Sequence, residues 1–208
     1  MEQASKTSPK SIEEFLRFRF KGLLDSIGQF LLKVGIHPNT VTIIGLIGNT
    51  IGAAFLAIGN FPIGGVVILI CGPIDALDGT LARLKGNSGK FGAFVDSVTD
   101  RYSELSILGG LLIHFLLIHD VLTCILIYLA AAGSVMVSYV KARAEALEFS
   151  AKVGILTRVE RYLVLAPLLV FSQPVPAMWI LAIFANFTAL QRIWFVRKQA
   201  YSQINSQK

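Results

Sequence analysis

Four aspartates at helical spacing are the residues of this sequence best suited to do chemistry. They lie in the segment DALDGTLARLKGNSGKFGAFVDSVTD, within an otherwise largely apolar chain, and they are Asp75, Asp78, Asp96 and Asp100. An ionised carboxylate near the middle of a bilayer costs roughly 2.5 to 3.5 kcal/mol on insertion scales. Four carboxylates on neighbouring helices therefore require strongly positive partners, and divalent metal ions fit this requirement.

The spacing predicts how these aspartates face each other. Asp75 and Asp78 are three residues apart, and Asp96 and Asp100 are four apart, so each pair shares one face of a helix. Because residues 84–90 form only a short connection, two antiparallel helices can present all four carboxylates to one another. Such a set around two adjacent metal ions can stabilise the attacking and leaving oxygens of a phosphoryl transfer. Oxygen-only ligands favour Mg²⁺ or Mn²⁺ over zinc.

Small residues beside the aspartates leave room for a ligand. Gly79 and Ala82 lack bulk where a ligand can approach the helix, and Gly92 allows the facing helix to come close. A large side chain at these positions is expected to close the site. Arg83, on the same face, is always charged and can hold a phosphate in a fork.

Two further charged residues follow Asp100 on the same predicted helix. Arg101 is its direct neighbour, and Glu104 lies one helical turn later. We expect Arg101 to balance charge locally, and a pair with Glu104 or Asp96 is the alternative.

The composition indicates which elements position the site. The chain has 208 residues, of which 54% are hydrophobic and only 15% are charged, as is typical of polytopic membrane proteins. Six runs of about 20 mostly apolar residues are long enough to cross roughly 30 Å of hydrocarbon. They are residues 39–59, 63–84, 91–117, 120–144, 156–173 and 176–196. The predicted fold is an all-α integral membrane protein with six transmembrane helices.

The distribution of charge predicts the orientation. If the chain begins inside, all 19 Lys and Arg residues fall on the inner side or in an inner helix end. The opposite turns, residues 59–62, 118–120 and 172–176, contain none. This positive-inside pattern places both termini and the aspartate site on the cytoplasmic side of the cell membrane. Topology and anionic lipid headgroups account for the net charge of +6, so no nucleic-acid partner is needed.

The chain divides into four predicted regions. Residues 1–10 are polar and predict a disordered tail. In residues 11–35, apolar side chains recur at helical spacing among cations, which predicts an amphipathic helix in the inner membrane interface. Packing of this helix on the cytoplasmic face of the bundle is an equal alternative. Residues 36–198 form the six-helix catalytic domain, and residues 199–208 form a cytoplasmic tail.

The motif D-x2-D-G-x2-A-R-x8-G-x3-D-x3-D runs from Asp75 to Asp100 without departure and resembles the signature of the CDP-alcohol phosphotransferase family. The resemblance implies transfer of a phosphatidyl-type group from a CDP-linked lipid to an alcohol, with release of CMP. It implies that two divalent cations share Asp75 and Asp96 as ligands, while Asp78 binds one ion and Asp100 binds the other. Asp100 is then also the catalytic base.

The same resemblance implies a nucleotide site and a homodimer. The implied CDP-lipid contacts lie around the motif, in the stretch that opens the first span, and just before the motif glycine. They are Gly79, Ala82, Arg83, Asn39, Thr40, Val41, Thr42, Ser88 and Gly89. A glycine face on the first span, Gly45, Gly48 and Gly52, is compatible with the homodimer.

A second basic group predicts the acceptor. It consists of Lys141, Arg158, Arg161 and Arg192, all at inner helix ends. Positive-inside topology is one interpretation, and a pocket for an acceptor that carries its own phosphate is the other. The SYVKARAEA stretch and the pair Arg158 and Arg161 look like those of prokaryotic phosphatidylinositol-phosphate synthases. This resemblance implies inositol 1-phosphate as acceptor. Glycerol 3-phosphate, serine and other small alcohols stay alternatives.

Two other classes of protein compete with the enzyme. Intramembrane aspartates also mark ion-coupled transporters. A transporter needs carboxylates near the midplane with access from both sides, whereas these lie at the inner end beside Arg83, Lys85 and Lys90. A structural interaction protein does not explain the complete motif. The sequence therefore favours the enzyme.

Overall fold

Helices form nearly all of the chain that the structure describes. This computed structural model describes residues 12–85 and 89–206, without the side chains of residues 12–18, Pro73, Asp75, Ala76 and Ser206. No strand occurs among these residues. The predicted tail, residues 1–10, and the predicted contact Ser88 lie outside them. The helices are α1 (Ile12–Lys33), α2 (Pro38–Ala57), α3 (Phe61–Leu84), α4 (Lys90–Leu117), α5 (Val121–Ala146), α6 (Arg158–Val170) and α7 (Pro174–Ser206).

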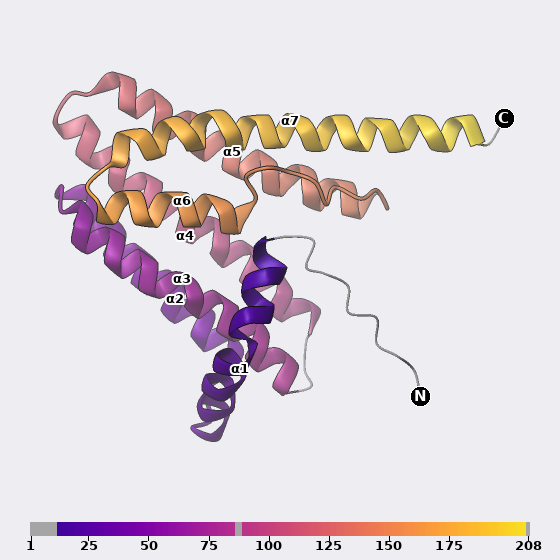
Figure 1. Cartoon of the computed structure of the whole chain (residues 1–208), viewed down its shortest axis with the longest axis horizontal. Coiled ribbons are helices and arrows are strands. Elements are labelled where there is room, and N and C mark those ends of the chain that lie inside the picture. Colours follow the sequence, from indigo (N-terminus) through magenta and orange to yellow (C-terminus); the bar gives the residue numbers. More distant parts are fainter. Residues whose placement is uncertain (1–11, 86–88, 207–208) are drawn as a thin grey trace.

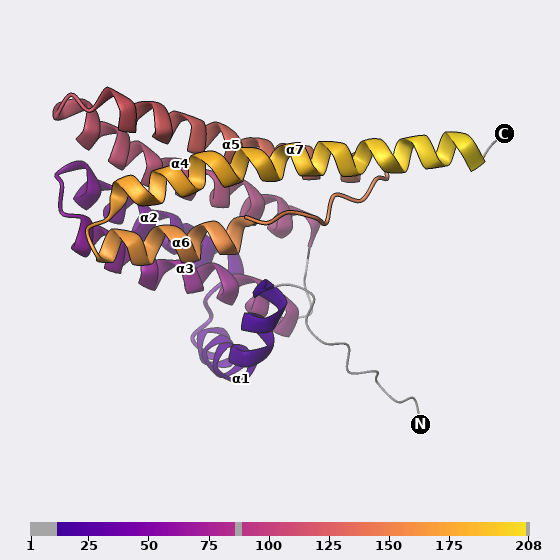
Figure 2. The ribbon, with the colours of Figure 1, turned by 45° about the horizontal axis from the view of Figure 1, so that its top comes forward.

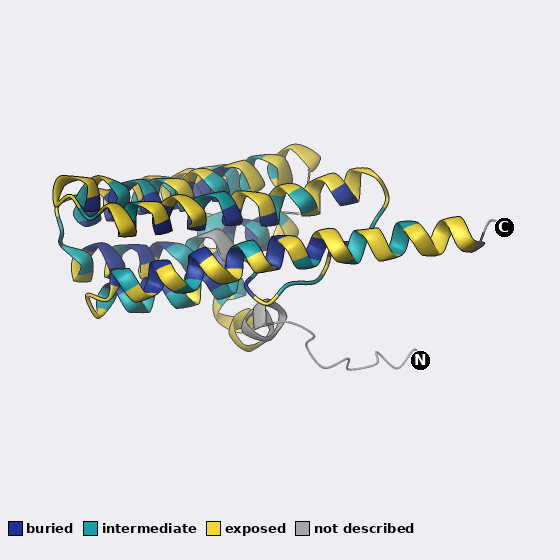
Figure 3. Ribbon diagram, turned by 90° about the horizontal axis from the view of Figure 1, so that it is seen from above, coloured by how far each residue is buried: buried dark blue, intermediate teal, exposed yellow. Residues whose placement is uncertain are grey.

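Helices α2 to α7 form one bundle, and α1 lies across one end of it (Figures 1 and 2). The bundle core is apolar and draws on all six helices, for example through Leu56, Ile68, Leu111, Ile127, Leu169 and Met178. Many large apolar side chains on the outside of the helices are exposed. Figure 3 shows this division between buried inner faces and exposed outer faces. An apolar outer surface of this extent is typical of contact with lipid.

Each predicted apolar run coincides with one helix of the bundle, but the helices differ in length. By length and composition, α2, α3, α5 and α7 can each cross a membrane. Helix α4 has 28 residues and carries charged side chains in its first half. Helix α6 has 13 residues, which is about 20 Å and shorter than the hydrocarbon layer. The predicted run 156–173 therefore contains a shorter helix than expected.

The turns α2–α3, α4–α5 and α6–α7 share one structure at one end of the bundle (Figure 1). Their middle residues, Gly59, His119 and Ser172, have φ angles of 82°, 60° and 55°. In each turn the next residue donates its backbone N–H to the carbonyl five positions back, with N···O distances of 2.7 to 2.9 Å. This is the Schellman motif, which satisfies the last carbonyls of a helix with main chain alone.

The glycines of α2 pack inside the chain. A Cβ at Gly48 would collide with the Sγ atom of Cys71 on α3. Similarly, a Cβ at Gly110 of α4 would collide with the carbonyl oxygen of Ala53 on α2. Close approach of α2 to its neighbours therefore requires these glycines. The glycine face lies against α3 rather than on a free surface, and the homodimer stays a prediction.

Helix α1 contacts the bundle with one face and exposes another. A Cβ at Gly28 would lie 3.0 Å from Cδ1 of Leu84 and 3.4 Å from Cγ2 of Thr80, both on α3. On its exposed side, large apolar residues recur every three or four positions. They are Phe20, Leu23, Ile27, Phe30 and Val34, with exposed fractions from 37% to 64%. The helix thus combines contact with the bundle and an uncovered apolar stripe.

Candidate active site

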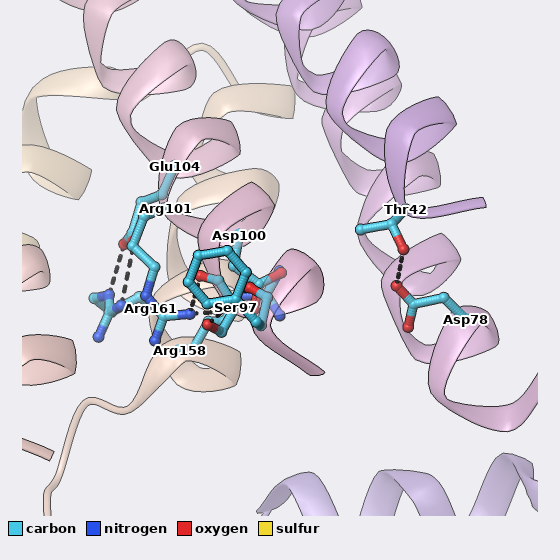
Figure 4. A network of polar contacts seen from close by, with 9 residues as sticks. Thr42, Asp78, Ser97, Asp100, Arg101, Glu104, Arg158 and Arg161 are labelled. Atoms are coloured by element: carbon cyan, nitrogen blue, oxygen red, sulfur yellow. Dashed lines mark hydrogen bonds and ion pairs between the residues drawn. The ribbon is translucent and has the colours of Figure 1, made fainter. Parts of the chain in front are cut away.

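The motif aspartates lie on α3 and α4, at the end of the bundle opposite the three short turns. We call this end the charged end. Asp78 stands in the last two turns of α3, and Asp96 and Asp100 stand in the first three turns of α4. Asp78 and Asp100 are buried, with exposed fractions of 5% and 7%, and Asp96 is half-buried. The side chain of Asp75 lies outside the described residues. Figure 4 shows the surroundings of Asp78 and of Asp100.

A hydroxyl group from α2 holds the Asp78 carboxylate. Thr42 Oγ1 donates to Asp78 Oδ2 at 2.5 Å, and both residues are buried. Thr42 Oγ1 also lies 3.2 Å from the carbonyl oxygen of Pro38. Because a hydroxyl has one hydrogen to donate, the shorter contact and the ionised acceptor favour Asp78. Thr42, predicted to contact the CDP-lipid, is therefore positioned to orient a predicted metal ligand.

Two arginines approach Asp100. Arg158 at the start of α6 places Nη2 2.5 Å from Asp100 Oδ1, and Arg101 places Nη1 3.5 Å from Asp100 Oδ2. Arg101 also donates to the carbonyl oxygen of Ser97. The contact with its neighbour Asp100 agrees with the expectation that Arg101 balances charge locally, rather than with the alternative of a pair with Glu104 or Asp96. The predicted base and one predicted acceptor cation are thus in contact (Figure 4).

Glu104 pairs with Arg161 of α6. Arg161 donates from Nε to Glu104 Oε1 at 2.7 Å and from Nη2 to Glu104 Oε2 at 3.0 Å. A third bond runs from Arg161 Nη1 to the carbonyl oxygen of Leu156 at 3.3 Å. Only 3% of the Arg161 side chain is exposed. Sequence analysis did not single out Glu104 for the site, although it lies one turn after Asp100 on the same helix face.

The other two predicted acceptor cations lie apart from this cluster. Arg192 of α7 is buried and donates to two backbone carbonyls, from Nε to Val153 at 2.8 Å and from Nη1 to Val137 at 2.7 Å. It thereby links α7 both to α5, through Val137, and to the non-helical segment between α5 and α6, through Val153. Lys141 is about half exposed, and its Nζ lies 4.0 Å from Glu145 Oε1. Arg158 is therefore the predicted acceptor cation that touches a motif aspartate.

Open space lies beside the motif glycine of α3. A Cβ at Gly79 would meet no atom of the described side chains within 4 Å, so a ligand can approach the helix there. On the facing helix, a Cβ at Gly92 would lie 3.8 Å from Oδ1 of Asn39, which brings the start of α2 to the motif. Arg83 is exposed, and its Nη2 donates to Thr80 Oγ1 at 3.1 Å. Its guanidinium retains further N–H groups for a phosphate.

The remaining predicted CDP-lipid contacts differ in exposure. Thr40 and Gly89 are exposed, Ala82 is half-buried, and Val41 is buried in the core. The apolar side chain of Val41 therefore supports the start of α2 by packing. Beside this region, Lys85 Nζ lies 3.0 Å from Nε2 of His37, which links the end of α3 to the start of α2.

The chemistry of the predicted donors fits a hard divalent cation. Asp78, Asp96 and Asp100 offer carboxylate oxygens only, which suits Mg²⁺ or Mn²⁺. Among the side chains that the structure describes, no three His, Cys, Asp or Glu residues are close enough to hold a metal ion together. The fourth predicted ligand, Asp75, is outside this set.

Fold and site together define a class of protein: a helical membrane bundle with buried carboxylates and arginines gathered at one end. Residues 35–198 match the family model described as CDP-alcohol phosphatidyltransferase. The chain therefore belongs to this family, as its motif suggested, and it is a multi-pass membrane enzyme.

Relatives in two domains of life are similar over almost the whole chain. The archaetidylinositol phosphate synthase of Pyrococcus horikoshii is 35% identical over 185 residues, which cover 88% of this chain and 96% of the relative. The phosphatidylinositol phosphate synthase of Streptomyces avermitilis is 34% identical over 205 residues, which cover 91% of this chain and 84% of the relative.

Solved structures of Mycobacterium tuberculosis phosphatidylinositol phosphate synthase have a similar fold. The structure with CDP-DAG bound has a TM-score of 0.78 and 30% identity, covering 83% of this chain and 92% of the other. The structure in complex with manganese and citrate also has a TM-score of 0.78, with 31% identity, covering 83% of this chain and 88% of the other. The all-helical membrane fold predicted from the sequence is thus confirmed at this level.

Proposed function

We propose that this enzyme transfers the phosphatidyl group of CDP-diacylglycerol to inositol 1-phosphate and releases CMP. The observation that carries the proposal is the 2.5 Å contact between Asp100 Oδ1 and Arg158 Nη2. It joins the predicted base to a cation predicted to bind the phosphate of the acceptor. An acceptor phosphate on Arg158 would therefore bring a nearby hydroxyl of the same molecule within reach of Asp100.

In the proposed reaction, Asp100 acts as the base. Its carboxylate takes the proton from the acceptor hydroxyl, and the hydroxyl oxygen attacks the β-phosphorus of the CDP-lipid. The bond from that phosphorus to the oxygen of CMP breaks as the new ester bond forms. Two bound divalent cations, Mg²⁺ or alternatively Mn²⁺, would neutralise the diphosphate and the departing CMP. Their proposed ligands are the four motif aspartates: Asp75, Asp78, Asp96 and Asp100.

Residues around the open space at Gly79 bind the CDP moiety in this proposal. The exposed guanidinium of Arg83 can pair with a phosphate oxygen in a fork. Asn39 lies beside Gly92 at the start of α2 and can donate hydrogen bonds from its amide. The complex of the mycobacterial relative with CDP-DAG supports a CDP-lipid as donor.

The acceptor is proposed from charge and from the relatives. Arg158 has 42% of its side chain exposed, and Lys141 has 46%, so both can meet a soluble phosphate. Arg161 and Arg192, which the sequence placed in the same pocket, are buried and bonded to protein groups. We therefore assign the acceptor phosphate to Arg158 and Lys141. The names of the relatives, both inositol phosphate lipid synthases, support inositol 1-phosphate.

The proposal includes a topology. All six helices from α2 to α7 cross the membrane within a catalytic domain of residues 36–198, and the short α6 is completed by residues 147–157. Side chains satisfy backbone groups of that segment: Arg192 bonds to Val153, Thr188 bonds to Leu156, and Gln199 bonds to Ser150. Non-helical backbone at membrane depth requires this kind of protection.

The orientation and the α1 helix complete this topology. The three short turns lack Lys and Arg, which supports an outer location for them and a cytoplasmic location for the site and both termini. The exposed apolar stripe of α1 supports its insertion into the inner interface. The homodimer and the cytoplasmic tail of residues 199–208 stay predictions.

A CMP-release assay tests the proposed function. The purified protein in detergent is given CDP-diacylglycerol and Mg²⁺ with inositol 1-phosphate, glycerol 3-phosphate, inositol or serine. We expect CMP with inositol 1-phosphate alone. CMP with glycerol 3-phosphate alone would keep the assignment of Arg158 to a phosphate and change the acceptor. CMP with an unphosphorylated alcohol at equal efficiency would contradict the phosphate site.

A further inference from the structure

Two ion pairs connect α4 to α6, and we call them the first rung (Asp100–Arg158) and the second rung (Glu104–Arg161). On α4, Asp100 and Glu104 are four residues apart, and on α6, Arg158 and Arg161 are three apart, so each pair of residues shares one helix face. Asp100 meets Arg158, and Glu104 meets Arg161 (Figure 4). The proposed function uses the first rung and gives no role to the second.

The two rungs differ in burial and in geometry. The Arg158 side chain is 42% exposed and touches Asp100 through Nη2, whereas the Arg161 side chain is 3% exposed. Arg161 and Glu104 form two parallel bonds, the fork geometry that orients a guanidinium most firmly. A phosphate entering from solution can reach Arg158, but it would have to displace Glu104 from Arg161.

The second rung also extends to α7. Arg161 Nη1 donates to the carbonyl oxygen of Leu156, and the backbone N–H of Leu156 donates to Thr188 Oγ1 of α7 at 3.1 Å. The start of α6 is therefore tied to α4 through Glu104 and to α7 through Thr188. Arg158 stands in this same first turn of α6.

We propose that Glu104 is a positioning residue for the transfer. It fixes Arg161 as a brace between α4 and α6, and this brace sets Arg158 opposite Asp100. Arg161 is then a structural partner of Glu104, and the acceptor phosphate is bound by Arg158. This inference rests on the proposed function for the role of Arg158, while the brace itself rests only on the contacts of Glu104 and Arg161.

The test compares single and double replacements of the buried pair. Removing one partner leaves a buried charge, whereas replacing both by apolar residues of similar size is often neutral. Thermal unfolding in detergent is measured without substrates for Glu104→Leu, Arg161→Met and the double variant. We expect each single replacement to lower the unfolding midpoint by about 10 °C and the double variant to recover most of it. A double variant no more stable than the singles would overturn the brace.

Kinetics then separate positioning from binding. Glu104→Leu is expected to raise the KM for the acceptor about tenfold, equal to 1.4 kcal/mol, with little change in the KM for CDP-diacylglycerol. The double variant should regain most of that loss, and Arg158→Gln should raise the acceptor KM while the Glu104–Arg161 pair stays intact. A double variant with an acceptor KM as high as Arg161→Met would show that Arg161 itself binds the phosphate. If the natural protein turned over a different acceptor, that acceptor would be used, and the unfolding data would test the brace independently.

Discussion

The two ends of the bundle solve the problem of connecting helices in different ways. At the end with the three short turns, α2, α4 and α6 end with the same Schellman hydrogen bonds, and the side chains of Asn60 and Asp120 cap α3 and α5. At the charged end, the segment of residues 147–157 is held by side chains of α6 and α7, and the carboxylates of α3 and α4 meet hydroxyls and arginines. Helix α5 also ends with Schellman bonds, at Glu148 of the charged end, so the difference lies in the buried carboxylates and arginines that only the charged end gathers among the described residues.

An aspartate at each end shows the difference. Asp120 caps α5 by accepting hydrogen bonds from Thr123 Oγ1 at 2.7 Å and Thr123 N at 3.0 Å. These bonds hold the pKa of Asp120 below its usual value. Asp100 is buried and faces arginines instead. The same side chain thus serves as a helix cap at one end and as a candidate base at the other.

The largest expected effect comes from Asp100→Asn. Loss of a general base slows a reaction by roughly 10² to 10⁴, and because Asp100 is also a proposed metal ligand, we expect no measurable CMP release. Binding of CDP-diacylglycerol should persist, since the nucleotide contacts lie elsewhere. The matched control is Asp120→Asn, because asparagine also caps helices well. Full activity of Asp100→Asn would remove it as the base.

A leucine at Gly79 should close the nucleotide site. A Cβ at Gly79 meets no described atom within 4 Å, so a leucine there extends into the place proposed for CDP. We expect Gly79→Leu to reduce kcat/KM for CDP-diacylglycerol roughly a hundredfold, or about 2.7 kcal/mol. Gly109→Leu is the control, since a Cβ at Gly109 also meets open space away from the site. Equal effects of the two variants would argue against a ligand at Gly79.

Thr42→Val tests whether α2 orients a metal ligand. Valine keeps the shape of threonine but removes the bond to Asp78, and loss of such a supporting bond reduces metal affinity by roughly 10- to 100-fold. We expect the Mn²⁺ affinity, measured by electron paramagnetic resonance, to fall about tenfold. The control is Thr50→Val, which removes a hydroxyl that donates to the carbonyl oxygen of Leu46 on the same helix. We expect it to leave the Mn²⁺ affinity almost unchanged. Unchanged Mn²⁺ affinity in Thr42→Val would leave Thr42 without this role.

The smallest expected effect is in the α4–α5 turn, at the end with the three short turns. His119 has a positive φ of 60°, a conformation that costs most residues about 1 to 2 kcal/mol and glycine almost nothing. His119→Gly should therefore raise the unfolding midpoint by a few degrees without changing CMP release. His119→Ala retains the positive φ and is the control. A stabilisation by alanine equal to that by glycine would exclude the backbone explanation.

The sequence was sufficient for features that depend on local pattern. Apolar runs and charge distribution predicted the helices, and the motif predicted the family, which the family model confirms. The predicted run 156–173 is longer than α6 because it includes residues 156–157 before the helix and the turn of residues 171–173 after it, which are not helical.

The pairing of charges could not be derived from the sequence. Arg101 has two carboxylates within one helical turn, Asp100 and Glu104, and only the three-dimensional packing of α6 decides that Glu104 meets Arg161. Likewise, Arg192 matches the pattern of a phosphate ligand, yet its guanidinium bonds to the backbone carbonyls of Val137 in α5 and Val153 in the segment that follows α5. Spacing along one helix identifies a face, but it does not identify the partner on another element.

The central claim is that the carboxylates of the charged end act with divalent cations. The most direct measurement is CMP release from CDP-diacylglycerol and the acceptor after complete chelation, followed by addition of Mg²⁺ or Mn²⁺. We predict that activity disappears on chelation and returns with either ion, and that Asp78→Asn or Asp96→Asn prevents the return. CMP release that continues at an unchanged rate after chelation would contradict the claim.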